Sequence, residues 1–319
     1  MEACEGQLRQ RSLRPESLQI GNRLDAADHV LRCRTDVTQA LAARGETRTP
    51  RNPRLGAFFL DTLKPEQQIR TYFQTLYDAW GQQHWWPAQS CFEVIVGAYL
   101  TQNTSWTNVE RALDSLRKAR VLSVRGIRRT PLPKLEKLIR SAGYFRQKAQ
   151  RLKTFVRFLD DQYGGSLARM FARPTEILRD QLLALNGVGP ETADSILLYA
   201  GNHPVFVVDA YTRRILERHE LIPAKAAYDD IRQLFERALA PVGEGSPDTN
   251  LVREPRSAAV GPRGSCHPPS AMSTAVRTPA AQVFNEMHGL IVGVGKNYCK
   301  KSQPLCEQCP LQRFLPGAQ

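Results

Sequence analysis

One stretch of this 319-residue chain, residues 183–216, restricts the fold more than any other. An apolar segment ends at Leu185 and is followed by the turn residues Asn186, Gly187, Val188 and Gly189. Glycine tolerates positive φ and allows close backbone approach, while the next residue, Pro190, suits the first turn of a helix. The pattern predicts two helices joined by a tight hairpin. Because the first N–H groups of a helix lack intrahelical partners, the second helix would offer an anion-binding end.

The same stretch delivers a single carboxylate to the start of a third helix. The apolar run 205–208 leads into Asp209, and helical spacing continues over 210–218. Rigid elements on both sides would therefore hold the acid in place. Each half of the stretch has an ordinary interpretation, a glycine C-cap or an aspartate N-cap. The two halves at this spacing nevertheless favour a functional site.

Together these residues resemble the helix-hairpin-helix and the catalytic aspartate of the endonuclease III (HhH-GPD) superfamily of DNA glycosylases. The matching positions are 185–189, Thr192-Ala193 and Val207-Val208-Asp209. The resemblance implies an all-α fold of two helical domains with a cleft between them, in which the chain starts in one domain, builds the other and returns. It also implies that hairpin amides hold a DNA phosphate, often with a bound monovalent cation, and that Asp209 is the catalytic acid.

The charge of the chain agrees with a polyanionic partner. Forty-four Lys and Arg residues against 31 Asp and Glu residues give a net charge of +13 and a pI near 9.7. Most of the excess falls outside residues 1–55 and 243–281, so a basic folded core is expected, as phosphate binding requires. A charge that only confers solubility is the alternative. No run of eighteen apolar residues exists, so we expect no membrane partner.

Composition divides the chain into four parts. Residues 1–62 are polar and lack sustained periodicity, which predicts a mostly disordered N-terminal extension. Residues 63–242 would form the glycosylase core, with a six-helix part at about 92–209. Residues 243–279, dominated by Gly, Pro, Ser and Arg, predict a flexible inserted linker. Residues 280–319 would supply a last helix and a cysteine cluster that return to the core. No strand pattern or internal repeat appears, so the predicted fold is all-α.

The residue at position 191 bears on the type of reaction. Some members of the superfamily also cut the DNA strand, using a lysine two residues after the hairpin to form a Schiff base. Glu191 stands at the matching position, and a carboxylate cannot form that intermediate. An ionised carboxylate such as Asp209 can stabilise the positive charge that develops on the sugar. The resemblance therefore implies a monofunctional glycosylase that leaves an abasic site.

The first half of the chain indicates a substrate class. Residues 84–87, 100–104 and 191–194 resemble the branch that contains bacterial 3-methyladenine DNA glycosylases, also called endonuclease III-related proteins. That branch implies a flipped base held in a pocket formed by Trp85, Trp86, Pro87, Trp106 and Glu191. N-alkylated purines are cationic and stack on indole faces through cation–π attraction of about 1–2 kcal/mol. Ordinary core packing is the alternative for the tryptophans.

Further DNA contacts are expected from the hairpin residues together with Thr192, Gln102 and Lys296. Gln102 resembles the superfamily residue that fills the gap left by a flipped base, although an ordinary exposed helix end is the alternative. Lys296 follows a Gly-Val-Gly turn and would face a phosphate, or simply solvent.

Three cysteines near the C-terminus indicate a metal site. Cys299, Cys306 and Cys309 have six and two intervening residues, which match the first three ligands of the superfamily's 4Fe–4S cluster. Leu315 stands at the fourth position, and such a cluster prefers four protein ligands. Several outcomes stay open: Cys266 or an external ligand completes the cluster, the cluster is lost, or the three cysteines and His288 hold zinc.

From these features we expect a monomeric, cytoplasmic bacterial protein that acts on duplex DNA in the nucleoid. The expected activity is that of a monofunctional base excision repair glycosylase, which hydrolyses the N-glycosidic bond of damaged, alkylated purines such as 3-methyladenine. One alternative is a bifunctional endonuclease III-type glycosylase and AP lyase acting on oxidised pyrimidines, against which Glu191 argues. Another is a non-catalytic helix-hairpin-helix DNA-binding protein, against which Asp209 argues.

Overall fold

The computed structural model of the chain describes residues 63–240 and 269–317. Within these ranges every regular element is a helix, which confirms the all-α prediction. The predicted N-terminal extension, 1–62, and residues 243–268 of the predicted linker lie outside the described residues. Among the described helices, none combines the length and the apolar composition that a bilayer span requires.

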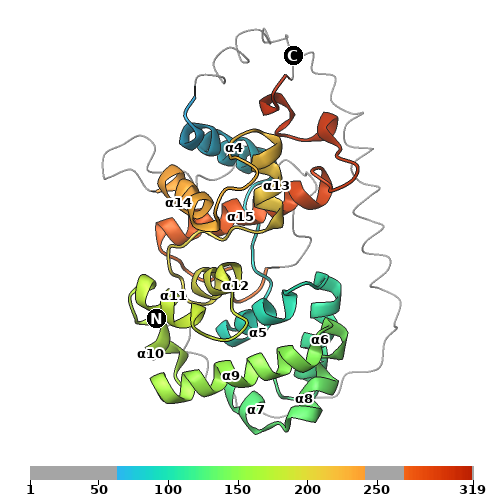
Figure 1. Cartoon of the computed structure of the whole chain (residues 1–319), viewed down its shortest axis with the longest axis vertical. Helices are drawn as coiled ribbons and strands as arrows, with labels where there is room; N and C mark the ends of the chain where they lie inside the picture. Colours follow the sequence, from blue (N-terminus) through green and yellow to red (C-terminus); the bar gives the residue numbers. More distant parts are fainter. Residues whose placement is uncertain (1–62, 241–268, 318–319) are drawn as a thin grey trace, which may run out of the picture. The chain divides into compact units, whose positions relative to one another are not determined.

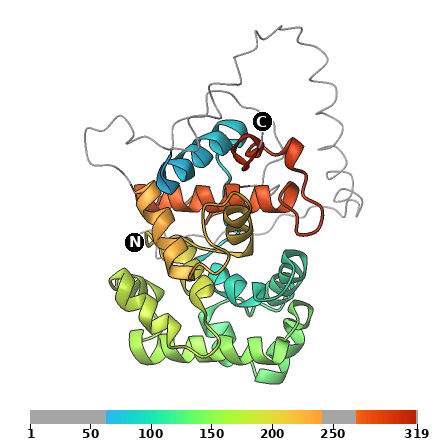
Figure 2. The same cartoon turned by 45° about the horizontal axis from the view of Figure 1, so that its top comes forward.

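The first group of helices contains both ends of the described chain. It consists of α4 (Pro65–Trp80), α13 (Ala210–Arg218), α14 (Tyr228–Leu239) and α15 (Pro279–Asn297). Helix α4 packs on α14, α13 packs on α15, and α15 also contacts α4 and α14. Figure 2 shows α15 running across this group with the other three helices beside it. The short turns η3 (Cys306–Gln308) and η4 (Gln312–Phe314) follow α15.

The second group of helices is built by the intervening chain (Figure 1). It consists of α5 (Cys91–Thr101), α6 (Trp106–Lys118), α7 (Val124–Arg129), α8 (Leu132–Leu138), the turn η1 (Arg140–Ala142), α9 (Phe145–Tyr163), α10 (Leu167–Phe171), α11 (Thr175–Leu183) and α12 (Pro190–Ser195). A π-helical turn, η2 (Ile196–Ala200), continues α12 and contacts both α5 and α15. The chain therefore starts in one group, builds the other and returns to the first, as predicted.

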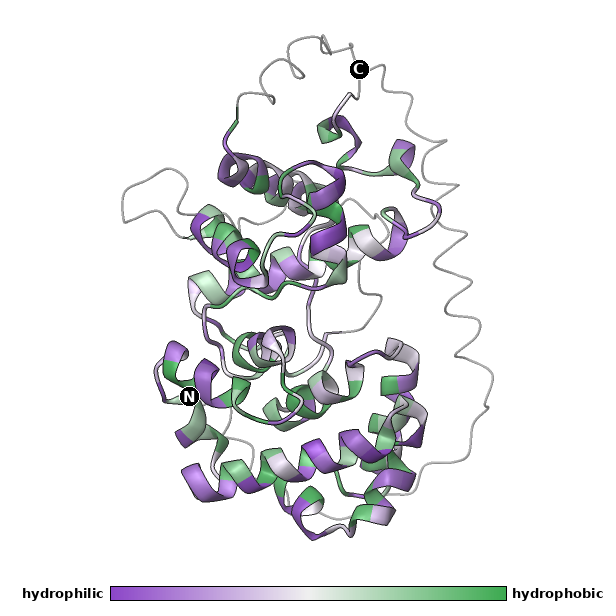
Figure 3. Ribbon diagram, viewed as in Figure 1, coloured by the Kyte–Doolittle hydropathy of each residue, from purple (hydrophilic) through white to green (hydrophobic). Residues whose placement is uncertain are grey.

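Two helices show why the apolar pattern determines the packing. Residues 91–100 of α5 are all buried, as expected for a helix that is apolar nearly all round, and the Ser90 hydroxyl caps it by accepting from the N–H of Glu93 at 3.2 Å. Helix α9 is amphipathic, and Figure 3 shows its alternation of hydrophobic and hydrophilic residues. Its buried face includes Leu152, Phe155, Val156 and Leu159. Burial of each such side chain stabilises the fold by about 1.5–3 kcal/mol.

The described end of the predicted linker, 269–278, is ordered and packed, so the linker prediction is wrong for these residues. Ser270 is buried, and its hydroxyl accepts from the N–H of Ala88 at 3.1 Å. The N–H of Met272 donates to the carbonyl of Ala88 at 3.0 Å. These contacts attach the segment to the chain that follows Trp86. Hydrogen bonds from small polar residues carry no apolar periodicity, which explains why the sequence pattern missed them.

Glu286 is a carboxylic acid buried within α15, with no exposed surface. Its carboxyl oxygens accept from the N–H of Gln83 at 2.6 Å and from the side-chain amide of Gln282 at 2.9 Å. Burial raises the pKa of Glu286 to about 7, and the hydrogen bonds and the charge of Arg277 oppose this shift only in part.

This raised pKa predicts a pH-dependent stability. Between about pH 5 and pH 7 the native protein holds a proton on Glu286 that the unfolded chain has released, so the free energy of unfolding should fall as pH rises. Glu286→Gln, which is neutral at every pH, should reduce this slope and raise stability at about pH 8. Urea unfolding across this range measures the effect. The exposed Glu176→Gln is the control, and a wild-type slope in Glu286→Gln would contradict the assignment.

Candidate active site

The predicted hairpin joins α11 to α12 through residues 184–189. Gly187 adopts φ +79°, a backbone conformation that residues other than glycine rarely adopt. The N–H of Val188 donates to the carbonyl of Leu185 at 3.1 Å. Val188 is buried and anchors the turn, whereas Asn186, Gly187 and Gly189 are exposed. Gly189 is the N-cap residue of α12, and no other atom lies within 4 Å of where its Cβ would stand. The hairpin therefore leaves open space in front of the first turn of α12.

Gln102 lies at the C-cap of α5 and contacts the hairpin directly. Its amide donates to the carbonyl of Gly187 at 3.0 Å and to the hydroxyl of Thr192 at 2.9 Å. The guanidinium of Arg151, on α9, donates to the Gln102 amide oxygen at 2.5 Å. The structure thus brings together two predicted DNA contacts, Gln102 and Thr192, with an arginine that the sequence did not single out. Arg151 gave no signal because it is one of many basic residues.

Asp209 is the N-cap residue of α13, as the sequence suggested. Its Oδ1 accepts from the backbone N–H of Thr212 at 2.7 Å and from the Thr212 hydroxyl at 2.9 Å. The preceding segment is fixed as well, because the N–H of Phe206 donates to Glu236 and that of Val208 donates to the hydroxyl of Tyr228. The Oδ2 atom lies 3.6 Å from Nε2 of His288. One carboxylate oxygen is therefore held by the helix, and the other is left for chemistry.

Glu191 lies in the first turn of α12 and interacts electrostatically with Asp209. The residue has exposed surface, yet the protein around its carboxyl displaces water. This desolvation, together with the negative charge of Asp209, raises the pKa of Glu191 to about 7. A carboxyl with a pKa near neutrality beside a second carboxylate is typical of an active site.

The three predicted pocket tryptophans form one aromatic cluster. The Trp86 ring stands edge-on to Trp106, with 5.1 Å between ring centroids, and lies 5.7 Å from Trp85. Trp85 and Trp86 are buried, whereas Trp106 and Pro87 are partly exposed. Gly97 of α5 permits this arrangement, because a Cβ there would stand 3.3 Å from Trp86. The rings therefore pack against one another, and Trp106 is the tryptophan of the three that keeps partly exposed surface.

Tyr199 and His288 connect this cluster to Asp209. Tyr199, on η2, packs against Trp86 at 5.1 Å, and its hydroxyl lies 2.6 Å from Nδ1 of His288. The exposed ammonium of Lys296 lies over the Trp85 ring, 5.7 Å from its centroid. The sequence reasoning missed Tyr199, because a tyrosine within an apolar helical run looks like any core residue.

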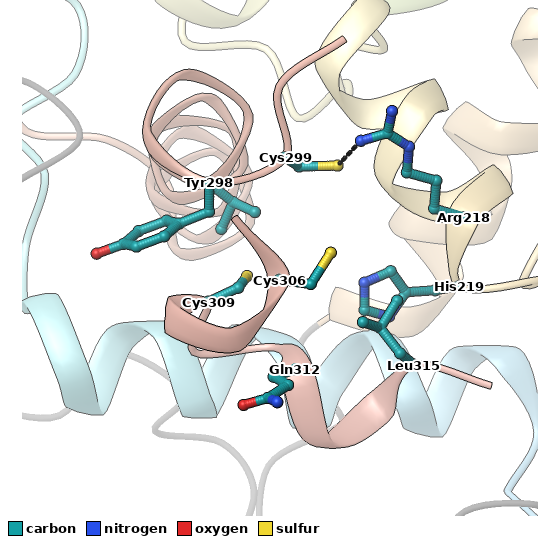
Figure 4. A pocket seen from close by; sticks show the side chains of 9 residues that line it. Arg218, His219, Tyr298, Cys299, Cys306, Cys309, Gln312 and Leu315 are labelled. Carbon is teal, nitrogen blue, oxygen red and sulfur yellow. Dashed lines mark hydrogen bonds between the residues drawn. The ribbon is translucent and has the colours of Figure 1, made fainter. Parts of the chain in front are cut away.

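The three C-terminal cysteines line one pocket (Figure 4). His219 and Leu315 also line it, and a guanidinium N–H of Arg218 donates to the Cys299 sulfur at 3.2 Å. Burial, and the neighbouring thiols, raise the pKa of Cys309 to about 11. The three thiols are the donor type that the predicted cluster uses and they line one pocket, but in the described residues they do not converge closely enough to hold a single metal ion. Leu315 lines the pocket without supplying a fourth, and Cys266 lies outside the described residues.

The hypothesis of zinc held by these cysteines and His288 is wrong for this geometry. His288 precedes Cys299 by eleven residues, which is about 16 Å along a helix, and it contacts Tyr199 instead. In the part of the chain that the structure describes, no three His, Cys, Asp or Glu side chains converge closely enough to hold a metal ion. The histidine that lines the cysteine pocket is His219.

Comparison with known proteins agrees with this geometry. Residues 96–241 match the HhH-GPD superfamily base excision DNA repair protein family. A protein of Methanocaldococcus jannaschii, named as a putative DNA repair glycosylase, is 39% identical over 250 residues, which cover 78% of this chain and 96% of that protein. The chain belongs to the HhH-GPD superfamily.

Solved structures show the same fold for this HhH-GPD protein. The 3-methyladenine DNA glycosylase MagIII of H. pylori, solved bound to 1,N6-ethenoadenine, is 26% identical with a TM-score of 0.54, covering 73% of this chain and 98% of that one. A trapped endonuclease III–DNA covalent intermediate is 20% identical with a TM-score of 0.57, covering 79% of this chain and 96% of that one. The protein is therefore a DNA glycosylase of base excision repair.

The family match includes Gln102, the hairpin and Asp209, but not every candidate residue. Trp85 and Trp86 precede the matched segment, and the three cysteines follow it. The hairpin and the acid thus lie in the segment that matches the family, as do Trp106 and Tyr199, while Trp85, Trp86 and the three cysteines lie outside that segment.

The two hairpin glycines should respond differently to substitution. Gly187→Ala should destabilise the protein by about 1 kcal/mol or more, because φ is positive and a Cβ would stand 2.0 Å from Nε of Arg151. Gly189→Ala should cost less, about 0.5 kcal/mol, since its Cβ would meet open space and only the preference of an N-cap for glycine over alanine is lost. Thermal unfolding measures both, and equal losses would contradict this account of the hairpin.

Proposed function

We propose that this HhH-GPD protein is a monofunctional DNA glycosylase that hydrolyses the N-glycosidic bond of alkylated purines, such as 3-methyladenine, in duplex DNA. The observation that carries the proposal is the Asp209 carboxylate, with Glu191 instead of a lysine at the matching position of α12 and an aromatic cluster connected to the acid through Tyr199 and His288. Similarity to MagIII, which is named as a 3-methyladenine DNA glycosylase, supports this substrate class.

Asp209 would act on the sugar. Departure of the base leaves positive charge on the sugar, and water then attacks C1′. An ionised Asp209 would stabilise this charge and accept the proton that the water loses. Because Oδ1 already accepts two hydrogen bonds from Thr212, Oδ2 is the oxygen available for this role. A cationic N-alkylated purine takes the bonding electron pair and leaves as a neutral base, so it needs no prior protonation.

The aromatic cluster would select the base. We propose that the flipped purine stacks against Trp86 and Trp106, next to Trp85 and Pro87, where indole faces attract a cationic ring. Glu191 would add a negative charge for the same base.

The hairpin would hold the DNA backbone. Backbone N–H groups at the start of α12 would bind a phosphate, with a monovalent cation at the hairpin, and Asn186, Gly187, Val188, Gly189 and Thr192 would line this contact. Gln102 would fill the gap left by the flipped base. To do so it must exchange its hydrogen bonds to Gly187 and Thr192 for bonds to the orphaned base. The protein would act as a monomer in the bacterial cytoplasm.

The thiol pocket would hold a 4Fe–4S cluster through Cys299, Cys306 and Cys309, with the fourth ligand supplied from elsewhere. A bound cluster would tie together the turns that follow α15. No step of base release depends on it.

Strand cleavage would need a nucleophilic amine, and two lysines, Lys148 and Lys296, are candidates for it. Burial lowers the pKa of Lys148 to about 8, but its ammonium donates to the carbonyls of Leu100 and Ala142 at 2.9 and 2.7 Å, so it serves as a helix cap. Lys296 is exposed and lies over Trp85. Glu191 cannot form a Schiff base. These observations favour hydrolysis without strand cleavage.

Base release from a panel of duplexes tests this proposal. Each duplex carries one lesion: 3-methyladenine, 7-methylguanine, thymine glycol or uracil. Release of the alkylated purines, with nicking only after alkali, is the expected result. Nicking without alkali, trapped by borohydride and lost in Lys296→Ala, would instead establish the lyase. Binding without any release would establish a non-catalytic DNA-binding protein.

Asp209→Asn should abolish most base release while preserving the fold. Asparagine caps a helix about as well as aspartate, so the thermal midpoint should hardly change. Loss of the negative charge should lower the single-turnover rate by about 100- to 1,000-fold, with DNA binding retained. The exposed Asp161→Asn, on α9, is the matched control. An Asp209→Asn protein that releases base at the wild-type rate would exclude Asp209 as the catalytic acid.

Glu191 should make recognition of cationic bases pH-dependent. Its carboxyl, with a pKa of about 7, is neutral near pH 6 and negative near pH 8, so affinity for alkylated DNA should rise over this range by about three- to tenfold. Glu191→Gln is neutral throughout and should bind with flat pH dependence. The enzyme concentration that gives half-saturation in single-turnover assays measures the affinity at each pH. A Glu191→Gln variant that kept the wild-type pH profile would exclude Glu191 as the group that makes affinity pH-dependent.

A further inference from the structure

His288 is a buried histidine that the proposed reaction has not used. It lies in the middle of α15 and is only 4% exposed. Its Nδ1 lies 2.6 Å from the hydroxyl of Tyr199, and its Nε2 lies 3.6 Å from Oδ2 of Asp209. Among the described residues, Nε2 has no hydrogen-bond partner. Both ring nitrogens therefore have identified neighbours, and one of these is the oxygen of Asp209 that the helix cap leaves free.

The neighbours of the ring determine where its proton lies. Tyr199 is fully buried, and this burial raises its pKa well above the usual value, so the phenol keeps its proton and can donate it to Nδ1. Burial lowers the pKa of His288, so the imidazole is neutral at pH 7 even though the charge of Asp209 opposes the shift. A neutral imidazole that accepts at Nδ1 carries its proton on Nε2.

We propose that His288 is a positioning residue for Asp209: Tyr199 fixes the Nε2–H tautomer of His288, and this N–H group orients the Oδ2 atom of the carboxylate during base release. The proposal rests on the proposed role of Asp209. A separation of 3.6 Å is too long for a direct hydrogen bond, but such bonds are often long in enzymes without substrate and shorten in the complex.

This arrangement would hold Asp209 from two sides. Thr212 donates twice to Oδ1, and His288 would donate to Oδ2, so the carboxylate would keep a single orientation. Tyr199 also packs on Trp86. A base that displaces the aromatic rings would therefore shift Tyr199 and His288, and with them the hydrogen bond to Asp209. The other charged groups that affect this region are Glu191 on α12, Lys296 on α15 and Arg277, which precedes α15.

Two substitutions of His288 distinguish the role of Nε2 from that of Nδ1. Gln can place an amide N–H near the position of Nε2, whereas Asn can reach only the position of Nδ1. His288→Asn should therefore lower the single-turnover rate of base release by about 10- to 100-fold, the usual effect of a hydrogen bond to a charged group, with unchanged DNA binding. His288→Gln should stay within about fivefold of wild type. The buried His203→Gln, outside this site, controls for the loss of a core histidine.

Equal loss in both His288 variants, or a loss confined to DNA binding, would overturn the proposal. A second measurement needs neither substrate nor variant stability. Long-range 1H–15N spectra of the wild-type protein labelled at histidine report the tautomer of each ring, and a neutral His288 with its proton on Nε2 is expected. A proton on Nδ1, or on both nitrogens at pH 7, would overturn the proposal. If wild type releases no base from any duplex, the proposed function fails, while the spectra still decide the tautomer.

Discussion

The hydrogen bonds between Asp209 and the first turn of α13 are the interaction on which the site depends. Thr212 donates to Oδ1 through both its backbone and its hydroxyl, so the acid that would perform the chemistry is also a helix cap. The partial positive charge at a helix N-terminus favours an ionised carboxylate there. Folding of α13 against α15 therefore fixes the position of the acid, and no flexible loop has to place it.

The hairpin is braced in a comparable way by helices that are distant in sequence. Gln102 at the end of α5 and Arg151 on α9 meet at Gly187, while the side chain of Val188 is buried. Side chains from α5 and α9 thus brace this six-residue connection. Binding of DNA at this hairpin would consequently affect the end of α5, which also carries the residues that pack around Trp86.

The junction between the two helical groups lies close to the acid. The π-helical turn η2 contacts α5 on one side and α15 on the other, and it carries Tyr199. Through this residue, the aromatic cluster and His288 belong to one packed network. Short π-helical turns within α-helices often occur at functional sites, because they shift the side chains that follow. Here the shifted register places a tyrosine hydroxyl within reach of the histidine beside Asp209.

The sequence alone determined the elements whose pattern is local. Helical spacing predicted the helix at 210–218 and the last helix, and glycine and proline placed the hairpin. These features depend on residues within one or two turns of each other, so the chain itself reports them. The three cysteines whose spacing indicated a metal site line one pocket.

Only the tertiary structure decided which distant side chains meet. It joined Gln102 to Thr192 and Arg151, joined His288 to Tyr199 instead of to the cysteines, and packed residues 269–278 against the segment after Trp86. None of these contacts is marked in the sequence by an apolar periodicity or by a motif. Each depends on the angle at which helices cross and on the direction of a buried side chain, and both are set by the packing of the whole core.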